Sequence, residues 1–62
     1  MKIRMKVTLY EYPKEHRPIR KKVYDVVKIA RAAYHPQTSY LYVLSINDER
    51  VVVFPGECEV IR

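Results

Sequence analysis

Cations and tyrosines share one side of the opening segment of the chain, KIRMKVTLYEY. Alternation with a period of two puts its aliphatic side chains on one face of a strand and leaves the other face polar. The polar face carries Lys2, Arg4, Lys6, Tyr10 and Tyr12. Side chains on one face recur about every 6.6 Å. Such a row offers phosphates an electrostatic partner and offers bases a stacking surface, so it predicts nucleic-acid binding.

A second group of cations follows closely and enlarges this candidate site. It consists of Arg17, Arg20, Lys21 and Lys22, with Lys14 between the two groups. We expect phosphate contacts from both groups and stacking from Tyr10 and Tyr12. Tyr42, from a later predicted strand, is expected to extend the stacking surface. The alternative is that Tyr42 lies in the core, because it shares a strand face with Leu44 and Ile46. The resulting binding would be only weakly selective for sequence, because stacking and charge tolerate any base.

The net charge of +5 is unevenly distributed along the 62 residues. Residues 1–31 carry ten Lys or Arg and three Asp or Glu, a net of +7, whereas residues 32–62 carry two and four, a net of −2. With a sequence pI of about 9.6, this asymmetry predicts a basic patch if the first half forms one face. The alternative is that folding interleaves the halves and pairs the charges.

Enzymatic residues are scarce, and we expect no catalysis, no cofactor, no metal and no small-molecule substrate. One glycine cannot form a phosphate-binding loop, and His16 and His35 lie far apart in predicted loops. Cys58 stands between two glutamates, so we expect it to point inward as a small apolar residue. The lone cysteine and the absence of an export signal or of about 18 consecutive apolar residues favour the cytoplasm.

The chain reads as one domain, residues 1–62, with prolines marking the breaks between strands. Strands are predicted at Lys2–Tyr12, Tyr40–Ile46, Arg50–Phe54 and Glu57–Arg62. Between the second and third of these, Asn47 or Asp48 is suited to the left-handed conformation of a hairpin turn. Pro13 and Pro18 bracket one loop, and Pro36 lies in another, YHPQTS.

The segment Val23–Tyr34 fits two structures. As a helix it is amphipathic, which would give a β-α-β-β layer with a helix near residues 21–34. As a strand it is supported by four β-branched residues in VYDVVKI and by the lack of helix caps. We predict the strand, and therefore an all-β fold of five short strands that curls into a small barrel or meander.

The ending VVVFPGECEVIR resembles the close of an SH3-like barrel, in which a strand ends at a proline, a tight turn follows and a short last strand alternates. LYEYP near the start is similar to the aromatic opening of eukaryotic SH3 domains. The resemblance implies an SH3-like fold. It does not extend to proline-rich peptide recognition, because the chain lacks the tryptophan which that family uses.

Self-assembly is the alternative function. The strands YLYVL and RVVVF are apolar on both faces, which predicts a homodimer or a subunit of a larger complex with exposed Tyr, Val and Phe. The two functions differ in their response to salt, because nucleic-acid binding weakens steeply as salt rises. Assembly through apolar strands would instead depend on protein concentration.

Overall fold

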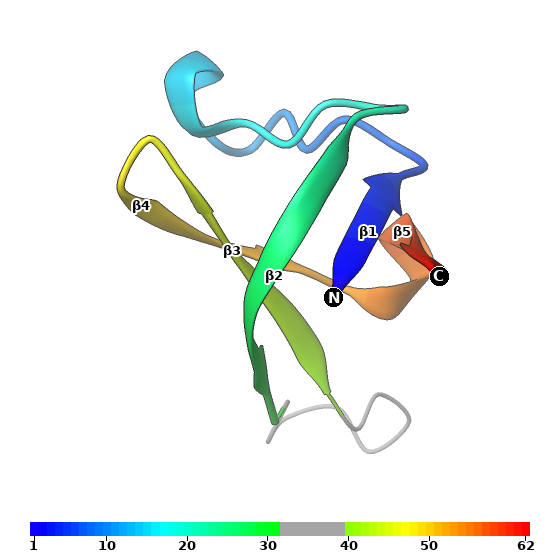
Figure 1. Ribbon diagram of the computed structural model, residues 1–62. Helices are drawn as coiled ribbons and strands as arrows, with labels where there is room; N and C mark the ends of the chain where they lie inside the picture. The colour runs from blue at the N-terminus through cyan, green and yellow to red at the C-terminus, as the bar shows by residue number, and fades with distance from the viewer. Residues whose placement is uncertain (32–39) are drawn as a thin grey trace.

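The computed structural model describes residues 1–31 and 40–62, and over these residues the fold is all-β, as predicted. The strands are β1 (Lys2–Met5), β2 (Val23–Ala30), β3 (Leu41–Ile46), β4 (Glu49–Val53) and β5 (Cys58–Ile61). All neighbours are antiparallel, and the strand order in the single sheet is β4-β3-β2-β1-β5 (Figure 1). Two short 3-10 helices, η1 (Lys14–His16) and η2 (Pro55–Glu57), lie between strands.

The strand alternative is confirmed for residues 23–30, where β2 starts at its predicted residue, and β3, β4 and β5 start and end within one residue of their predicted limits. Asn47 and Asp48 both have positive φ, at 51° and 67°. This is the left-handed conformation expected of the β3–β4 hairpin turn. Residues 32–34 of the predicted strand, and the predicted loop with His35 and Pro36, lie outside the described residues.

The first strand is shorter than predicted, because the chain leaves the sheet after Met5. Val7, expected in the core, is 43% exposed, although Leu9 is buried as expected. Residues 6–22 instead form one long two-legged loop, which we call the basic loop. Its legs are joined by irregular hydrogen bonds, such as the one from the Leu9 amide to the Pro18 carbonyl (3.1 Å). In the sequence, apolar and polar residues continue to alternate beyond Met5, although no strand pairing forms there. The pattern therefore predicted a longer strand.

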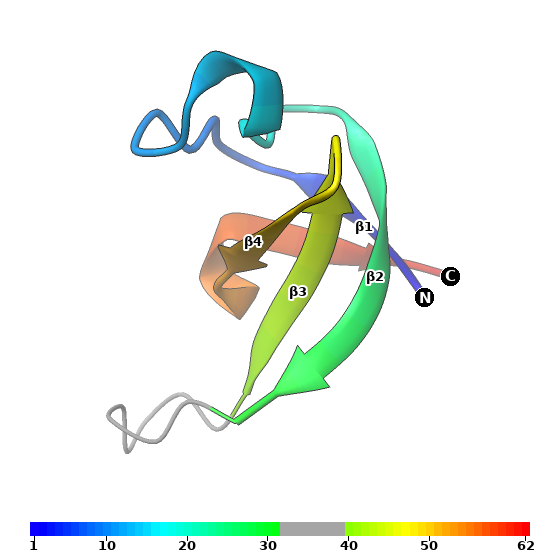
Figure 2. The same ribbon diagram turned by 90° about the vertical axis from the view of Figure 1, so that its left-hand side faces the viewer.

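The core lies on the inner face of the curled sheet (Figure 2). Ile3, Leu44, Val51 and Val53 are fully buried there, and the Cys58 side chain also points inward, as predicted. Burial raises the pKa of the Cys58 thiol, and the nearby Glu57 carboxylate raises it further. The thiol therefore stays protonated near neutral pH, as an apolar core residue would.

A β-bulge halfway along β2 changes which of its side chains point to the inner face of the sheet. Val26 pairs with Leu44 but Lys28 pairs with Val43, so Val27 has no partner in the ladder. Beyond the bulge, Ile29 pairs with Tyr42 and belongs to the inner face. Ile29 is nevertheless 55% exposed, because this end of the inner face is incompletely covered.

The outer edge of β4 is covered by the Tyr12 side chain. Its hydroxyl donates to the Val52 carbonyl (3.3 Å) and accepts from the Val52 amide (3.0 Å). Tyr12 is half-buried against the core, so the expectation that its ring projects from the surface is wrong. The residue satisfies backbone groups that an edge strand otherwise leaves open.

We expect Tyr12→Phe to lower the free energy of unfolding by about 1–2 kcal/mol, because a part-buried amide and carbonyl lose their partner. Urea denaturation measures this change. The matched control is Tyr10→Phe, which removes a hydroxyl from a side chain that is 74% exposed and should leave stability unchanged. Equal stability of the two variants would contradict a structural role for the Tyr12 hydroxyl.

Candidate nucleic-acid interface

Lys2 and Arg4 project from the outer face of β1 as predicted, but each is paired with a carboxylate. The Lys2 ammonium lies 3.4 Å from Asp25 on β2, and the Arg4 guanidinium lies 3.1 Å from Glu59 on β5. The strand register sets both contacts, because the partners are directly opposite one another. Exposed pairs of this kind add little stability, yet they balance the charge of the row. The predicted continuous cationic face along β1 is therefore wrong.

Most of the net positive charge lies in the basic loop. Its 17 residues include six Lys or Arg and two Glu, a net of +4, whereas all other residues together carry a net of +1. Neither of the two ion pairs found within residues 1–31 and 40–62 involves a cation of this loop. The loop thus carries positive charge that the fold leaves without a salt bridge.

Four of the predicted phosphate-binding residues gather at the base of this loop. We call them the basic cluster: Lys6, Arg20, Lys21 and Lys22, all exposed. Backbone hydrogen bonds from Met5 to the Lys22 carbonyl (2.9 Å) and from Lys21 to the Met5 carbonyl (2.8 Å) join the two legs where they leave the sheet. The Arg20 Nε donates to the Lys6 carbonyl (3.2 Å), and the Arg20 amide donates to the Thr8 hydroxyl (2.9 Å). These hydrogen bonds hold the backbone of the cluster and the Arg20 guanidinium in place, while all four residues remain exposed.

Lys21 occupies a backbone conformation that favours glycine. Its φ is 73°, in a turn closed by a hydrogen bond from the Lys22 amide to the Ile19 carbonyl (3.1 Å). The third position of such a type II turn prefers glycine, and a left-handed lysine costs about 1–2 kcal/mol. Lys21 therefore places a charged side chain at a turn position where glycine would cost less.

We expect Lys21→Gly to leave the free energy of unfolding unchanged or to raise it by up to about 1 kcal/mol. Relief of the left-handed strain is partly offset by the larger entropy of glycine in the unfolded chain. Lys22→Gly is the matched control, because Lys22 has no positive φ and should only lose stability. Denaturant titration of both variants measures this, and equal losses would show that Lys21 is unstrained.

The far end of the basic loop is attached to the β3–β4 hairpin. The His16 Nδ1 lies 2.9 Å from the Ile46 carbonyl and donates to it, and the Asn47 side-chain amide donates to the Glu15 carbonyl. Figure 2 shows η1 above the hairpin turn. The loop is therefore fixed at its tip as well as at its base.

Tyr10 and Arg17 lie together near this end of the loop. The Arg17 guanidinium carbon is 5.1 Å from the centroid of the Tyr10 ring, a cation–π contact. Tyr10 is 74% exposed, as the sequence predicted. Sequence reasoning placed both residues in the site but gave no reason to pair them, because their contact depends on the path of the loop.

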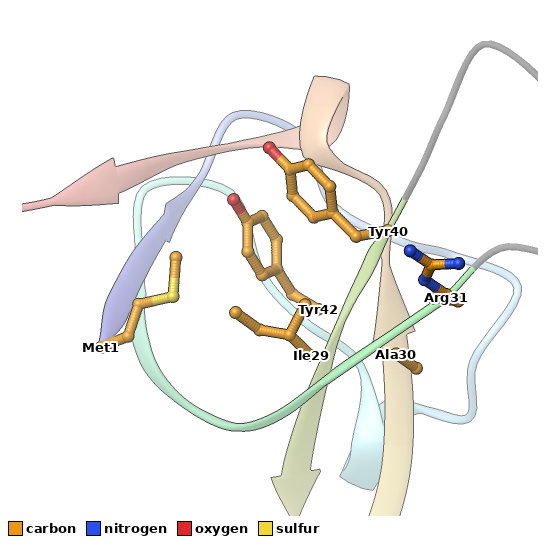
Figure 3. Close-up of a pocket in the computed structure, with 6 residues that line it drawn as sticks. All are labelled: Met1, Ile29, Ala30, Arg31, Tyr40 and Tyr42. Atoms are coloured by element: carbon orange, nitrogen blue, oxygen red, sulfur yellow. The ribbon is translucent and has the colours of Figure 1, made fainter.

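Tyr42 lies elsewhere, in a hollow at the other end of β2 from the basic cluster (Figure 3). The hollow has a volume of about 490 Å³ and is lined by Met1, Ile29, Ala30, Arg31, Tyr40 and Tyr42. The Tyr42 ring is only 4% exposed and packs edge-on against Tyr40, with ring centroids 5.4 Å apart. The prediction that Tyr42 offers an open stacking face is therefore wrong.

Hydrogen bonding to the Tyr40 side chain, followed by burial, raises the pKa of Tyr42 to about 12. An unfolded tyrosine ionises near pH 10, so the neutral phenol stabilises the fold below that pH. This stabilisation is lost as the pH rises from about 10 to 12. We expect Tyr42→Phe to show a smaller fall in the free energy of unfolding over this range than wild type. Denaturation at a series of alkaline pH values measures it, and an unchanged slope would contradict the assignment to Tyr42.

Comparison with protein-family models, curated proteins and solved structures finds no match for this chain. In the described part of the chain, no helix has the length and hydropathy needed to span a bilayer.

Proposed function

We propose that the chain binds nucleic acid through the basic loop, with the basic cluster as the principal phosphate contact. The observation that carries this proposal is the concentration of +4 of the net charge of +5 in residues 6–22. The cations of this loop have no salt-bridge partner among the described residues. The backbone hydrogen bonds bring these cations together and the Arg20 guanidinium is held by the Lys6 carbonyl, so less order has to be gained on binding. Counterion release supplies the driving force.

The contribution of Lys2 and Arg4 is secondary in this proposal. Each would have to exchange an existing carboxylate partner for a phosphate, so the gain on binding is smaller than for an unpaired cation. Phosphate contact therefore falls mainly to the basic cluster, with Arg17 at the far end of the loop. Contacts to phosphates carry no direct sequence information, which fits weak sequence selectivity.

We further propose that the fold is an SH3-like barrel and that the protein acts in the cytoplasm. Support for the barrel comes from the end of the chain, where β4 stops at Val53, η2 begins at Pro55 and β5 starts at Cys58. This is the order of strand, tight turn and short strand on which the resemblance rests. The buried free thiol of Cys58 fits a reducing compartment.

Neutralising three cations of the cluster tests the proposed site. We expect Arg20→Gln/Lys21→Gln/Lys22→Gln to weaken oligonucleotide binding and to reduce the slope of log K against log salt concentration by between about 2 and 3. Fluorescence anisotropy with labelled single-stranded and duplex oligonucleotides, titrated at several salt concentrations, measures both quantities.

The matched control removes the same charge from the sheet and the C-terminal end: Lys28→Gln/Arg50→Gln/Arg62→Gln. It should largely retain the wild-type slope. Equal losses in the two triple variants would show that net charge, and not the loop, determines binding. Lys21→Gly adds a finer test, because it removes one charge from a turn that accepts glycine and should lower the slope by about 0.7–0.9.

Self-association is the second candidate, and β2 supplies the observation that favours it. Val27 and Ile29 are 51% and 55% exposed, whereas β3 and the centre of β4 are largely covered. An apolar interface would therefore involve β2, and not mainly the strands YLYVL and RVVVF. Light scattering at increasing protein concentration distinguishes this function, since a dimer formed in this way persists at high salt.

A further inference from the structure

The Tyr10 ring has one covered face and one open face. Arg17 lies over the ring at 5.1 Å from its centroid. The Arg17 Nε donates to the Tyr12 carbonyl at 3.1 Å, and the Arg17 residue is half-buried. The guanidinium is therefore anchored, and through it the orientation of Tyr10 is restricted. The ring nevertheless remains 74% exposed, so its other face is open to water.

Tyr10 differs in this respect from the other tyrosines that the structure describes. Tyr12 and Tyr24 are half-buried and use their hydroxyls to bind backbone groups. Tyr40 and Tyr42 pack against each other beside the hollow. Exposing so much aromatic surface gives the folded chain no packing energy, so the open ring is suited to a ligand that covers it.

Both arginines of the basic loop are held in the same way. Arg17 donates its Nε to Tyr12, and Arg20 donates its Nε to Lys6. Each guanidinium therefore keeps its terminal amino groups for other acceptors, and a phosphate accepts two such N–H groups side by side. The loop thus presents two pre-oriented guanidinium groups that can bind phosphate and one aromatic ring face.

We propose that Tyr10 stacks on an unpaired base and that the ligand of the basic loop is single-stranded nucleic acid. The inference rests on the proposed function and specifies its ligand class. Bases inside a duplex already have a neighbour on each face, so an aromatic side chain on a rigid loop reaches only an unpaired base. Arg17 holds the ring from the other side, which lowers the entropy lost when the base stacks.

The test compares a labelled single strand of mixed sequence with its duplex at low salt, by fluorescence anisotropy. We expect wild type to prefer the single strand. Tyr10→Leu should weaken single-strand binding by about 5- to 140-fold, the effect of losing one stacked base, and should leave duplex binding unchanged. Tyr10→Phe keeps the ring and should bind as wild type does.

The matched control is Tyr40→Leu, which removes a partly exposed ring at a distance from the basic loop and should retain single-strand affinity. Circular dichroism verifies that each variant is folded. Equal binding of single strand and duplex, with no effect of Tyr10→Leu, would overturn this inference and leave the proposed function standing. Failure to bind either oligonucleotide at low salt would overturn both.

Discussion

The pairing of β1 on both sides holds this small fold together. Three of its residues pair with β2 on one side and all four pair with β5 on the other, and the strand contributes Ile3 and Met5 to the centre of the core. A chain of 62 residues buries only about 60% of the surface of its unfolded form, so each fully buried side chain matters. The same strand fixes the base of the basic loop, because Met5 hydrogen-bonds to both Lys21 and Lys22. Loss of β1 would therefore remove the core and the candidate site together.

The strands were predictable where a segment was rich in β-branched residues and ended at a turn former. This describes β2 to β5, and the Asn47-Asp48 turn was predictable for the same local reasons. The residue at which β1 ends was not predictable. Val7 and Leu9 continue the alternation, but the Lys6 amide donates to the Glu57 carbonyl and the Leu9 amide to the Pro18 carbonyl. No local pattern encodes these distant partners. The bulge at Val27 was equally hidden, since it depends on the register against β3.

Only part of the candidate site was predictable. The sequence gives the positions of the charged residues, but it does not show which of them form ion pairs in the folded chain. Lys6 and the three cations at positions 20–22 gather as expected. Lys2 and Arg4 do not act with them, because the strand register places Asp25 and Glu59 opposite. The environments of the tyrosines also depend on the fold. Nothing in the sequence indicated that Tyr12 would cover a strand edge. Tyr42 shares a strand face with Leu44 and Ile46, and that alternation agrees with its place in the core while Tyr10 stays in water.

The contact between β1 and β5 also has a kinetic consequence. It joins residues as far apart as Arg4 and Glu59, 55 positions along the chain, and both views place the N- and C-termini near each other (Figures 1 and 2). Contacts of such high sequence separation slow the folding of small domains, since a large loop must close before the contact forms. A peptide link between the adjacent ends would make the β1–β5 contact local in sequence and remove that closure step.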